Sequence, residues 1–105
     1  MKATYENVLK KLTLIENEMK KINLWQKEPL KEEQYDFRAA FASDTMAYSQ
    51  WLQFIFIPRV HQIIDEKGEF PSSSQVGTQA MREFDGVYEA QKLVELLNDF
   101  DDLFN

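Results

Sequence analysis

The sequence predicts an all-α fold, a compact single-domain bundle of about four helices around a buried central helix that is kinked by a proline. Apolar residues recur at helical spacing near both ends of the chain, and a strongly apolar run with one proline lies between them. Only three glycines and three prolines occur in 105 residues, which is few for an all-β protein with many tight turns. No linker or repeat divides the chain, so we expect residues 1–105 to form one domain.

The first predicted helix covers about residues 3–25. Its apolar positions are spaced three and four residues apart: Tyr5, Val8, Leu12, Ile15, Met19 and Ile22. Such a seam forms either one wall of an intramolecular bundle or the interface of a coiled-coil homodimer, and we favour the bundle. Pro29 should end this region, because the residue before a proline avoids helical geometry.

A short helix is expected over about residues 31–41, followed by the central helix over about residues 46–67. Asp44 or Thr45 is suited to cap the central helix, because a side-chain oxygen there accepts hydrogen bonds from the free amides of the first turn. Apolar residues surround this helix, but the unbroken run Phe54–Pro58 is far shorter than the roughly 20 residues that cross a bilayer. We therefore expect the central helix to be the buried centre of the protein.

The second half of the chain predicts a kink, a loop and two helical segments. Pro58 has no N–H for the preceding turn, so a kink or a break is expected there. Gly68 suits the left-handed position after the helix end. The serine-rich stretch 69–77 should be a loop, followed by a short helical turn at 78–84 and the last helix at 87–104. That helix carries an apolar stripe: Tyr88, Leu93, Leu96, Leu97, Phe100, Leu103 and Phe104.

Charge is distributed unevenly along the chain. The net charge is −6, yet residues 1–31 hold seven lysines and four glutamates, whereas the remainder holds five basic and fourteen acidic side chains. We expect the basic first helix to pack beside the last helix, where lysines would offset Asp99, Asp101 and Asp102 at the unfavourable end of the helix dipole. A basic docking stripe for RNA is the alternative, although the acidic chain as a whole disfavours nucleic acid.

The residue types exclude several kinds of chemistry. No cysteine occurs, which excludes disulfides and thiolate sites. His61 and Asp65 lie one turn apart and supply too few ligands for a metal, so we expect a surface pair, no metal and no cofactor. No Gly-x-Ser-x-Gly motif supports a serine nucleophile, and the acidic residues of 32–44 lie in a highly charged, wet segment that would not raise their pKa by burial. We therefore assign no catalytic residue.

A frame of polar and aromatic residues in and around the apolar run is the candidate structural or interaction site: Asp44, Trp51, Gln53, Phe54, Phe56, Arg59 and His61. Gln53 should face the core and need a hydrogen-bond partner. Arg59 should pair with a carbonyl or with an acid from another helix, because Asp44 lies too far away along the chain. The frame is either a buried network that fixes one packing arrangement or the polar rim of an aromatic docking patch.

Three motifs keep a specific spacing in the middle of the chain: Asp44-Thr45-Met46, Trp51-Leu52-Gln53 and Ile57-Pro58-Arg59. Together with Phe41, His61, Asp65 and Pro71, they resemble the YqcC-like family of small bacterial proteins, and the resemblance extends over nearly the whole chain. It implies an all-helical fold without an established activity. Members have been labelled in connection with tRNA pseudouridine synthase C, which implies an accessory factor, because a synthase needs a much larger, β-rich domain.

We therefore expect a small non-enzymatic helical protein that binds another protein, with an RNA-modification enzyme as the kind of partner. The charged, amphipathic N-terminal region is unlike a signal peptide, which predicts a cytoplasmic protein without a membrane attachment. Two alternatives stay open. A pocket that gathers Asp44, Arg59 and His61 would favour an uncharacterised enzyme, and lysines segregated on one face of the first helix would favour RNA binding. Exposed aromatic surface from Trp51 to Phe56 would favour protein binding.

Overall fold

The computed structural model describes residues 3–105, and all regular structure in this range is helical, which confirms the all-α prediction. Three short elements, η1, η2 and η4, are 3-10 helices, and η3 is a π-helix. The order is α1 (Tyr5–Lys21), η1 (Glu32–Tyr35), η2 (Ala40–Ala42), α2 (Tyr48–Trp51), η3 (Leu52–Phe56), α3 (Ile57–Asp65), α4 (Val76–Glu83), η4 (Tyr88–Ala90) and α5 (Gln91–Asp102). Within the described range, no helix is both long and apolar enough to span a membrane.

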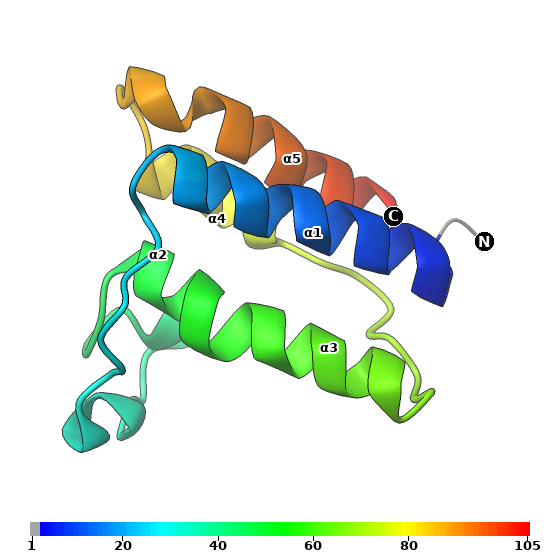
Figure 1. Ribbon diagram of the computed structural model, residues 1–105, viewed down its shortest axis with the longest axis horizontal. Helices are drawn as coiled ribbons and strands as arrows, with labels where there is room; N and C mark the ends of the chain where they lie inside the picture. Colours follow the sequence, from blue (N-terminus) through cyan, green and yellow to red (C-terminus); the bar gives the residue numbers. More distant parts are fainter. Residues whose placement is uncertain (1–2) are drawn as a thin grey trace.

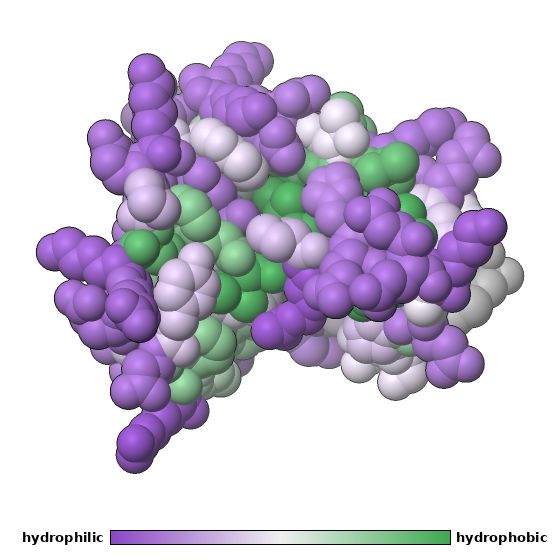
Figure 2. Space-filling view, turned by 60° about the horizontal axis from the view of Figure 1, so that its bottom comes forward, coloured by the Kyte–Doolittle hydropathy of each residue, from purple (hydrophilic) through white to green (hydrophobic). Residues whose placement is uncertain are grey.

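The helices are arranged in two layers (Figure 1). α1 and α5 lie side by side and run in opposite directions, with α4 packed against α5 and partly hidden behind α1. The rod formed by α2, η3 and α3 makes the second layer below α1. Buried side chains from both layers meet in one core. Figure 2 shows that hydrophilic side chains cover most of the surface seen from below, while apolar ones gather in a band through its middle.

The apolar seam of α1 faces the inside of the protein. Four of its six positions are buried, as expected for one wall of a bundle: Val8, Leu12, Ile15 and Met19. The helix is capped by the hydroxyl of Thr4, which accepts a hydrogen bond from the amide of Asn7 (3.1 Å). At the other end Asn23 takes a left-handed φ of 64°, and the amide of Leu24 donates to the carbonyl of Met19 (2.8 Å).

The rod from α2 to α3 stays helical throughout, because the disruption expected at Pro58 takes the form of a π-helical turn. Residues Leu52–Phe56 form this turn, and the amide of Ile57 donates to the carbonyl of Leu52, five residues back. Pro58 then falls in the first turn of α3, the position in a helix that tolerates a missing N–H. The rod thus accommodates a proline, which lies on its exposed side, through one wider turn.

The end of α3 differs from the prediction for Gly68. α3 stops at Asp65, so the left-handed position falls on Lys67 (φ 52°), one residue before the glycine. The amide of Gly68 donates to the carbonyl of Ile63 (2.9 Å), which closes the helix. The carbonyl of Gly68 accepts a hydrogen bond from the hydroxyl of Tyr5, and this contact ties the end of α3 to α1.

The connection from α1 to the rod is less regular than predicted. Instead of one helix over residues 31–41, the chain forms η1 and η2, separated by irregular backbone. Phe41 takes a positive φ of 56°, and the carboxylate of Asp44 accepts hydrogen bonds from the amides of Arg38 (3.0 Å) and Ala39 (3.3 Å). These hydrogen bonds compete with helical ones, and the continuous helix does not form. The predicted turn at 78–84 is instead the full helix α4, beginning at residue 76.

Aromatic contacts run through the core. Trp51 is 8% exposed and stacks between Tyr48 and Phe56, with ring centroids 5.6 Å away on each side. Phe41 meets Trp51 edge-on at 5.0 Å, and Phe56 meets Phe100 of α5 edge-on at 5.1 Å. Such pairs add about 0.5–1.5 kcal/mol each beyond the burial of their surface. The rings therefore lock the rod to the preceding loop and to α5.

α4 and α5 approach each other closely at Gly77, which is buried in the first turn of α4. A Cβ at this position would lie 2.5 Å from Oδ1 of Asn98 and 2.6 Å from its Cα. Both distances are shorter than real Cβ contacts, so this crossing requires a glycine.

Replacing Trp51 by Ala should lower the free energy of unfolding by about 3–5 kcal/mol, because the lost ring leaves a cavity in the core. Urea unfolding followed by circular dichroism measures the loss. Trp25→Ala is the matched control, since Trp25 is only partly buried, with the Lys20 amine 5.2 Å from its ring. Equal losses in the two variants would contradict the central place of Trp51 in the core.

Gly77→Ala should lower the free energy of unfolding by about 1–3 kcal/mol, because the added methyl group pushes α4 away from α5. Gly68→Ala is the control, since the nearest atoms to its added Cβ lie at 3.7 and 3.8 Å, ordinary contact distances. Calorimetry of both variants gives the comparison. Helix propensity alone predicts that Gly77→Ala stabilises the protein, so a gain would mean that the close approach is not needed.

Candidate functional site

The aromatic members of the predicted frame do not form a docking surface. Trp51 and Phe56 are 8% and 7% exposed, and their faces are covered by the ring contacts of the core. Phe54 is partly exposed and packs against the same core. Residues 51–56 therefore do not form the contiguous exposed aromatic surface that would mark a docking site. Trp51 and Phe56 stabilise the core instead.

Gln53 is buried and bonded to the main chain of a distant residue. Its Oε1 accepts from the amide of Gln26 (3.0 Å), and its Nε2 donates to the carbonyl of the same residue (2.8 Å). Gln50 extends this network by donating to Oε1 of Gln26 (3.0 Å) and by accepting from the amide of Ala47 (2.9 Å). A buried amide is stable only with such partners. The network fastens the loop after α1 to the rod, which is a structural role.

Asp44 and Thr45 do not cap the central rod. The residue before α2 is Ala47, which has no capping oxygen. The hydroxyl of Thr45 donates to the carbonyl of Gln34 (2.6 Å). Asp44 binds upstream amides, and the hydrogen bond from the amide of Arg38 is the main cause that holds the pKa of this carboxyl below its ordinary value. Both side chains therefore shape the loop rather than the helix.

Arg59 and His61 do not form the pairs expected of them. Across residues 3–105, Arg59 makes no ion pair and no hydrogen bond to a carbonyl; its exposed side chain lines a small pocket. His61 is partly exposed and forms no ion pair with Asp65. The pocket at Arg59 includes neither Asp44 nor His61, so the three residues of the alternative enzyme site do not line one pocket. No three of the described His, Asp and Glu side chains cluster as a metal site requires.

The packing of α5 beside α1 is as predicted, but of the three acids expected to meet lysines only Asp99 pairs with α1 among the described residues. Three lysines of this helix form ion pairs: Lys10 with Glu6 (3.5 Å), Lys11 with Asp99 of α5 (3.6 Å) and Lys20 with Glu16 (2.8 Å). Pairs near the surface contribute at most about 1 kcal/mol each. Their main consequence is that part of the positive charge of α1 is already matched within the chain.

A buried carboxylate that sequence reasoning missed anchors the start of α4. Asp101, near the end of α5, is 5% exposed. It accepts hydrogen bonds from the hydroxyl of Ser74 (2.6 Å) and from the amides of Val76 (3.0 Å) and Gly77 (2.8 Å). Asp101 thus caps α4 from a different helix, at the end where the helix dipole favours an anion. No local capping pattern marks Asp101, because its partners lie more than twenty residues away along the chain.

Burial raises the pKa of Asp101 above its ordinary value, and the hydrogen bonds from Ser74 and the α4 amides offset only part of this effect. Burial also raises the pKa of Tyr48, and the charges of Asp101 and Glu83 add to it. The hydroxyl of Tyr48 donates to the carbonyl of Val76 (2.7 Å). Side chains from α2 and α5 therefore converge on the first residue of α4, one as donor and one as acceptor.

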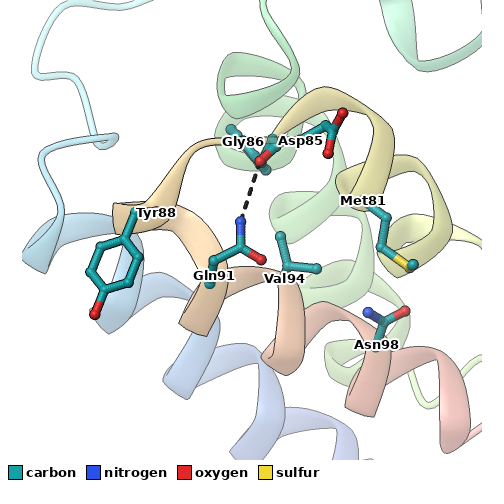
Figure 3. Close-up of a pocket in the computed structure, with 8 residues that line it drawn as sticks. Met81, Asp85, Gly86, Tyr88, Gln91, Val94 and Asn98 are labelled. Atoms are coloured by element: carbon teal, nitrogen blue, oxygen red, sulfur yellow. Dashed lines mark hydrogen bonds between the residues drawn. The ribbon is translucent and has the colours of Figure 1, made fainter.

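The far end of α4 opens into a surface cavity, which we call the α4–α5 groove (Figure 3). Its volume is about 480 Å³, and α4, the following turn and α5 supply its lining: Met81, Phe84, Asp85, Gly86, Tyr88, Gln91, Val94 and Asn98. Val94 lies at the base between the two sides, and the sulfur of Met81 points toward Asn98. The ring of Tyr88 extends away from the cavity on the opposite side.

Hydrogen bonds within the turn fix the shape of the groove. Gly86 takes a positive φ of 77°, and the amide of Val87 donates to the carbonyl of Phe84 (3.0 Å). Nε2 of Gln91 donates to the carbonyls of both Phe84 (3.3 Å) and Val87 (2.9 Å), and the first of these bonds is drawn in Figure 3. The groove is therefore formed before any partner binds.

The rim of the groove is apolar and open to solvent. Tyr88 is 87% exposed, Met81 58% and the neighbouring Val87 41%. Single exposed apolar residues are ordinary, but Tyr and Met are enriched at protein interfaces, and one of each lies among the lining residues of this cavity. The prediction that Tyr88 belongs to the apolar stripe of the last helix is wrong, because α5 begins only at Gln91. Tyr88 lies instead in the 3-10 helix η4, between the turn at Gly86 and the start of α5.

These observations define a small all-helical protein with a shaped apolar groove. The chain belongs to the DUF446 family, whose description reads "tRNA pseudouridine synthase C" and whose profile matches residues 7–103. An uncharacterized protein of Haemophilus influenzae is 32% identical over 90 residues, which cover 83% of this chain and 82% of that protein. The solution NMR structure of protein YqcC from E. coli has a TM-score of 0.82 at 25% identity and covers 95% of this chain and 86% of its own. The resemblance inferred from the motifs is confirmed.

A third relative is much longer than the matched segment. A protein of Pectobacterium carotovorum subsp. carotovorum named tRNA pseudouridine synthase C is 36% identical over 59 residues. The match covers 56% of this chain but only 16% of that protein. The larger part of that relative therefore lies outside the shared segment.

The raised pKa of Asp101 predicts a specific pH dependence. An acid that holds its proton more tightly in the folded than in the unfolded state stabilises the fold at low pH, and this contribution is lost as the pH rises from the ordinary value of 3.8 through the raised one. The free energy of unfolding of the wild type, minus that of Asp101→Asn, should therefore fall with rising pH, by about 1.4 kcal/mol for each unit by which the pKa is raised.

Urea unfolding of both proteins at several pH values between acid and neutral measures this difference. Asp102→Asn is the control, since Asp102 is exposed on the same helix and forms no ion pair with a described residue. A difference that increases with pH would contradict the prediction, because it would mean that the hydrogen bonds to the ionised carboxylate outweigh the effect of burial.

Proposed function

We propose that this protein is a non-enzymatic accessory factor of the cytoplasm that binds another protein through the α4–α5 groove, and that its partner is a tRNA pseudouridine synthase. The observation that carries the proposal is the exposed pair Tyr88 and Met81 at the edge of a cavity that is already shaped, with the exposed Val87 next to Tyr88 in the chain. Aromatic and Met side chains that fill a partner's pockets supply most of the energy of many interfaces. A groove of this kind needs no chemistry from its own residues.

The choice of partner rests on the relative from Pectobacterium. That protein is named a tRNA pseudouridine synthase C, and the segment like this chain makes up a small part of it. Joining two segments in one chain turns their association into an intramolecular step with a high effective concentration. A segment that is joined to a synthase in one protein is a reasonable candidate to bind such an enzyme where it is separate.

Two features of the site support the non-enzymatic side of the proposal. The polar residues that were candidates for catalysis are used for folding or are apart: Asp44 holds a loop, and the pocket at Arg59 does not include His61. The groove itself carries one acidic side chain, Asp85, and no basic side chain among its described lining residues. General acid–base chemistry needs a positioned pair of such groups with suitable pKa values.

The test uses the purified protein and the tRNA pseudouridine synthase C of the same organism, with affinity measured by calorimetry. Tyr88→Ala should weaken binding by about tenfold or more, as truncation of an interface anchor does. Adding Met81→Ala to this variant should weaken binding further. Tyr35→Ala is the matched control, since Tyr35 is 50% exposed and lies on η1, outside the groove.

Each result bears on a different part of the proposal. Absence of binding by the wild type would overturn the synthase as partner. Binding that Tyr88→Ala and Met81→Ala leave unchanged would overturn the groove. Because these side chains are exposed, their removal should leave the urea unfolding midpoint close to that of the wild type, and this measurement separates lost binding from lost folding.

A further inference from the structure

We propose that the pocket beside Arg59 is a binding site for a small aromatic carboxylate, with the ring inside the pocket and the carboxylate on the guanidinium. This site lies between α3, the segment before α4, and α5, apart from the α4–α5 groove, and none of its lining residues belongs to that groove. The proposal does not depend on the protein-binding function.

The walls of the pocket are mainly apolar and suit a single ring. Its volume is about 210 Å³, and its aromatic lining comes from three different parts of the fold: Trp51, Phe56, Phe70, Phe100 and Phe104. This volume is about seven times the roughly 30 Å³ that a water molecule occupies in the liquid, and it lies below the roughly 300 Å³ at which pockets for drug-sized ligands begin. A guest with one ring fits such a volume, whereas a nucleotide does not.

Contacts among the rings hold the pocket open in advance. Phe56 and Phe100 meet at 5.1 Å, Phe100 and Phe104 at 5.1 Å, and Phe104 and Phe70 at 5.6 Å. Tyr5 of α1 supports Phe70 from outside at 5.3 Å. Water between such walls finds few hydrogen-bond partners, while an aromatic guest gains edge and face contacts of the same kind. Binding therefore needs little rearrangement, which favours affinity.

Arg59 determines the charge of the guest. It is the only charged side chain among the described residues that line the pocket, and it forms no ion pair within residues 3–105. Asp101 binds Ser74 of the pocket wall and the amides of α4, and it forms no ion pair with Arg59. A guanidinium stays charged and matches a carboxylate with two parallel hydrogen bonds. One cation balances one negative charge, which favours a carboxylate over a phosphate dianion.

The test is a titration of the full-length, isotopically labelled protein followed by two-dimensional NMR, with phenylacetate as the probe and phenylacetamide as its neutral counterpart. Phenylacetate should produce saturable shifts at Arg59, Phe70 and Val76, and should quench or shift the emission of Trp51. Phenylacetamide should bind about tenfold more weakly or worse, because it lacks the charge-assisted hydrogen bonds. Arg59→Gln should reduce the affinity for phenylacetate to that for the amide.

Arg82→Gln is the matched control, since Arg82 is an exposed arginine of α4 outside the pocket, and this variant should bind like the wild type. Equal affinity for the acid and the amide, or equal binding by wild type and Arg59→Gln, would overturn the assignment of a carboxylate. Shifts that map to the α4–α5 groove, or no saturable shift at millimolar probe, would overturn the pocket itself. Because Arg59 is exposed, the Gln variant should keep the unfolding midpoint of the wild type.

Discussion

The position of α4 depends on one buried carboxylate at the end of the neighbouring helix. Asp101 accepts three hydrogen bonds at the point where an irregular segment turns into α4. The segment before this point supplies one wall of the pocket at Arg59, and the far end of α4 supplies one side of the α4–α5 groove. Both candidate sites therefore rest on the same anchor, and the close approach of Gly77 to Asn98 leaves α4 little freedom to move relative to α5.

The predicted frame divides into residues that the fold uses and one that it does not. Trp51 and Phe56 fill the core, Gln53 binds the main chain of Gln26, and Asp44 binds amides of its own loop. Packing explains why the first two positions are aromatic, and hydrogen bonding explains why the other two are polar. Arg59 has no comparable role, because its charge is unpaired in the described part of the chain and its side chain lies at the mouth of an apolar pocket. A charged residue without a structural task is the more informative one for function.

The parts of the structure that could be predicted are those governed by local pattern. The seam of α1 is set by spacing alone, and the burial of Trp51 by the apolar run around it. The parts that could not be predicted depend on contacts between distant residues. Asp101 looked unfavourable at the end of its own helix, and only the fold brings it to the start of another. Tyr88 had the right spacing for the last helix, but it lies in the 3-10 helix η4 that precedes α5.

The π-helical turn at Leu52–Phe56 makes the length of this segment matter as much as its composition. A π turn contains one residue more than an α turn, so the extra residue is absorbed within the turn and the helix beyond it keeps its faces. Closing the turn to α geometry with every residue retained would rotate α3 by about 100° around its axis. Val60 would leave the core, and the guanidinium of Arg59 would be carried away from the aromatic pocket. Relatives that share the pocket should therefore have either this wider turn or a rod that is one residue shorter.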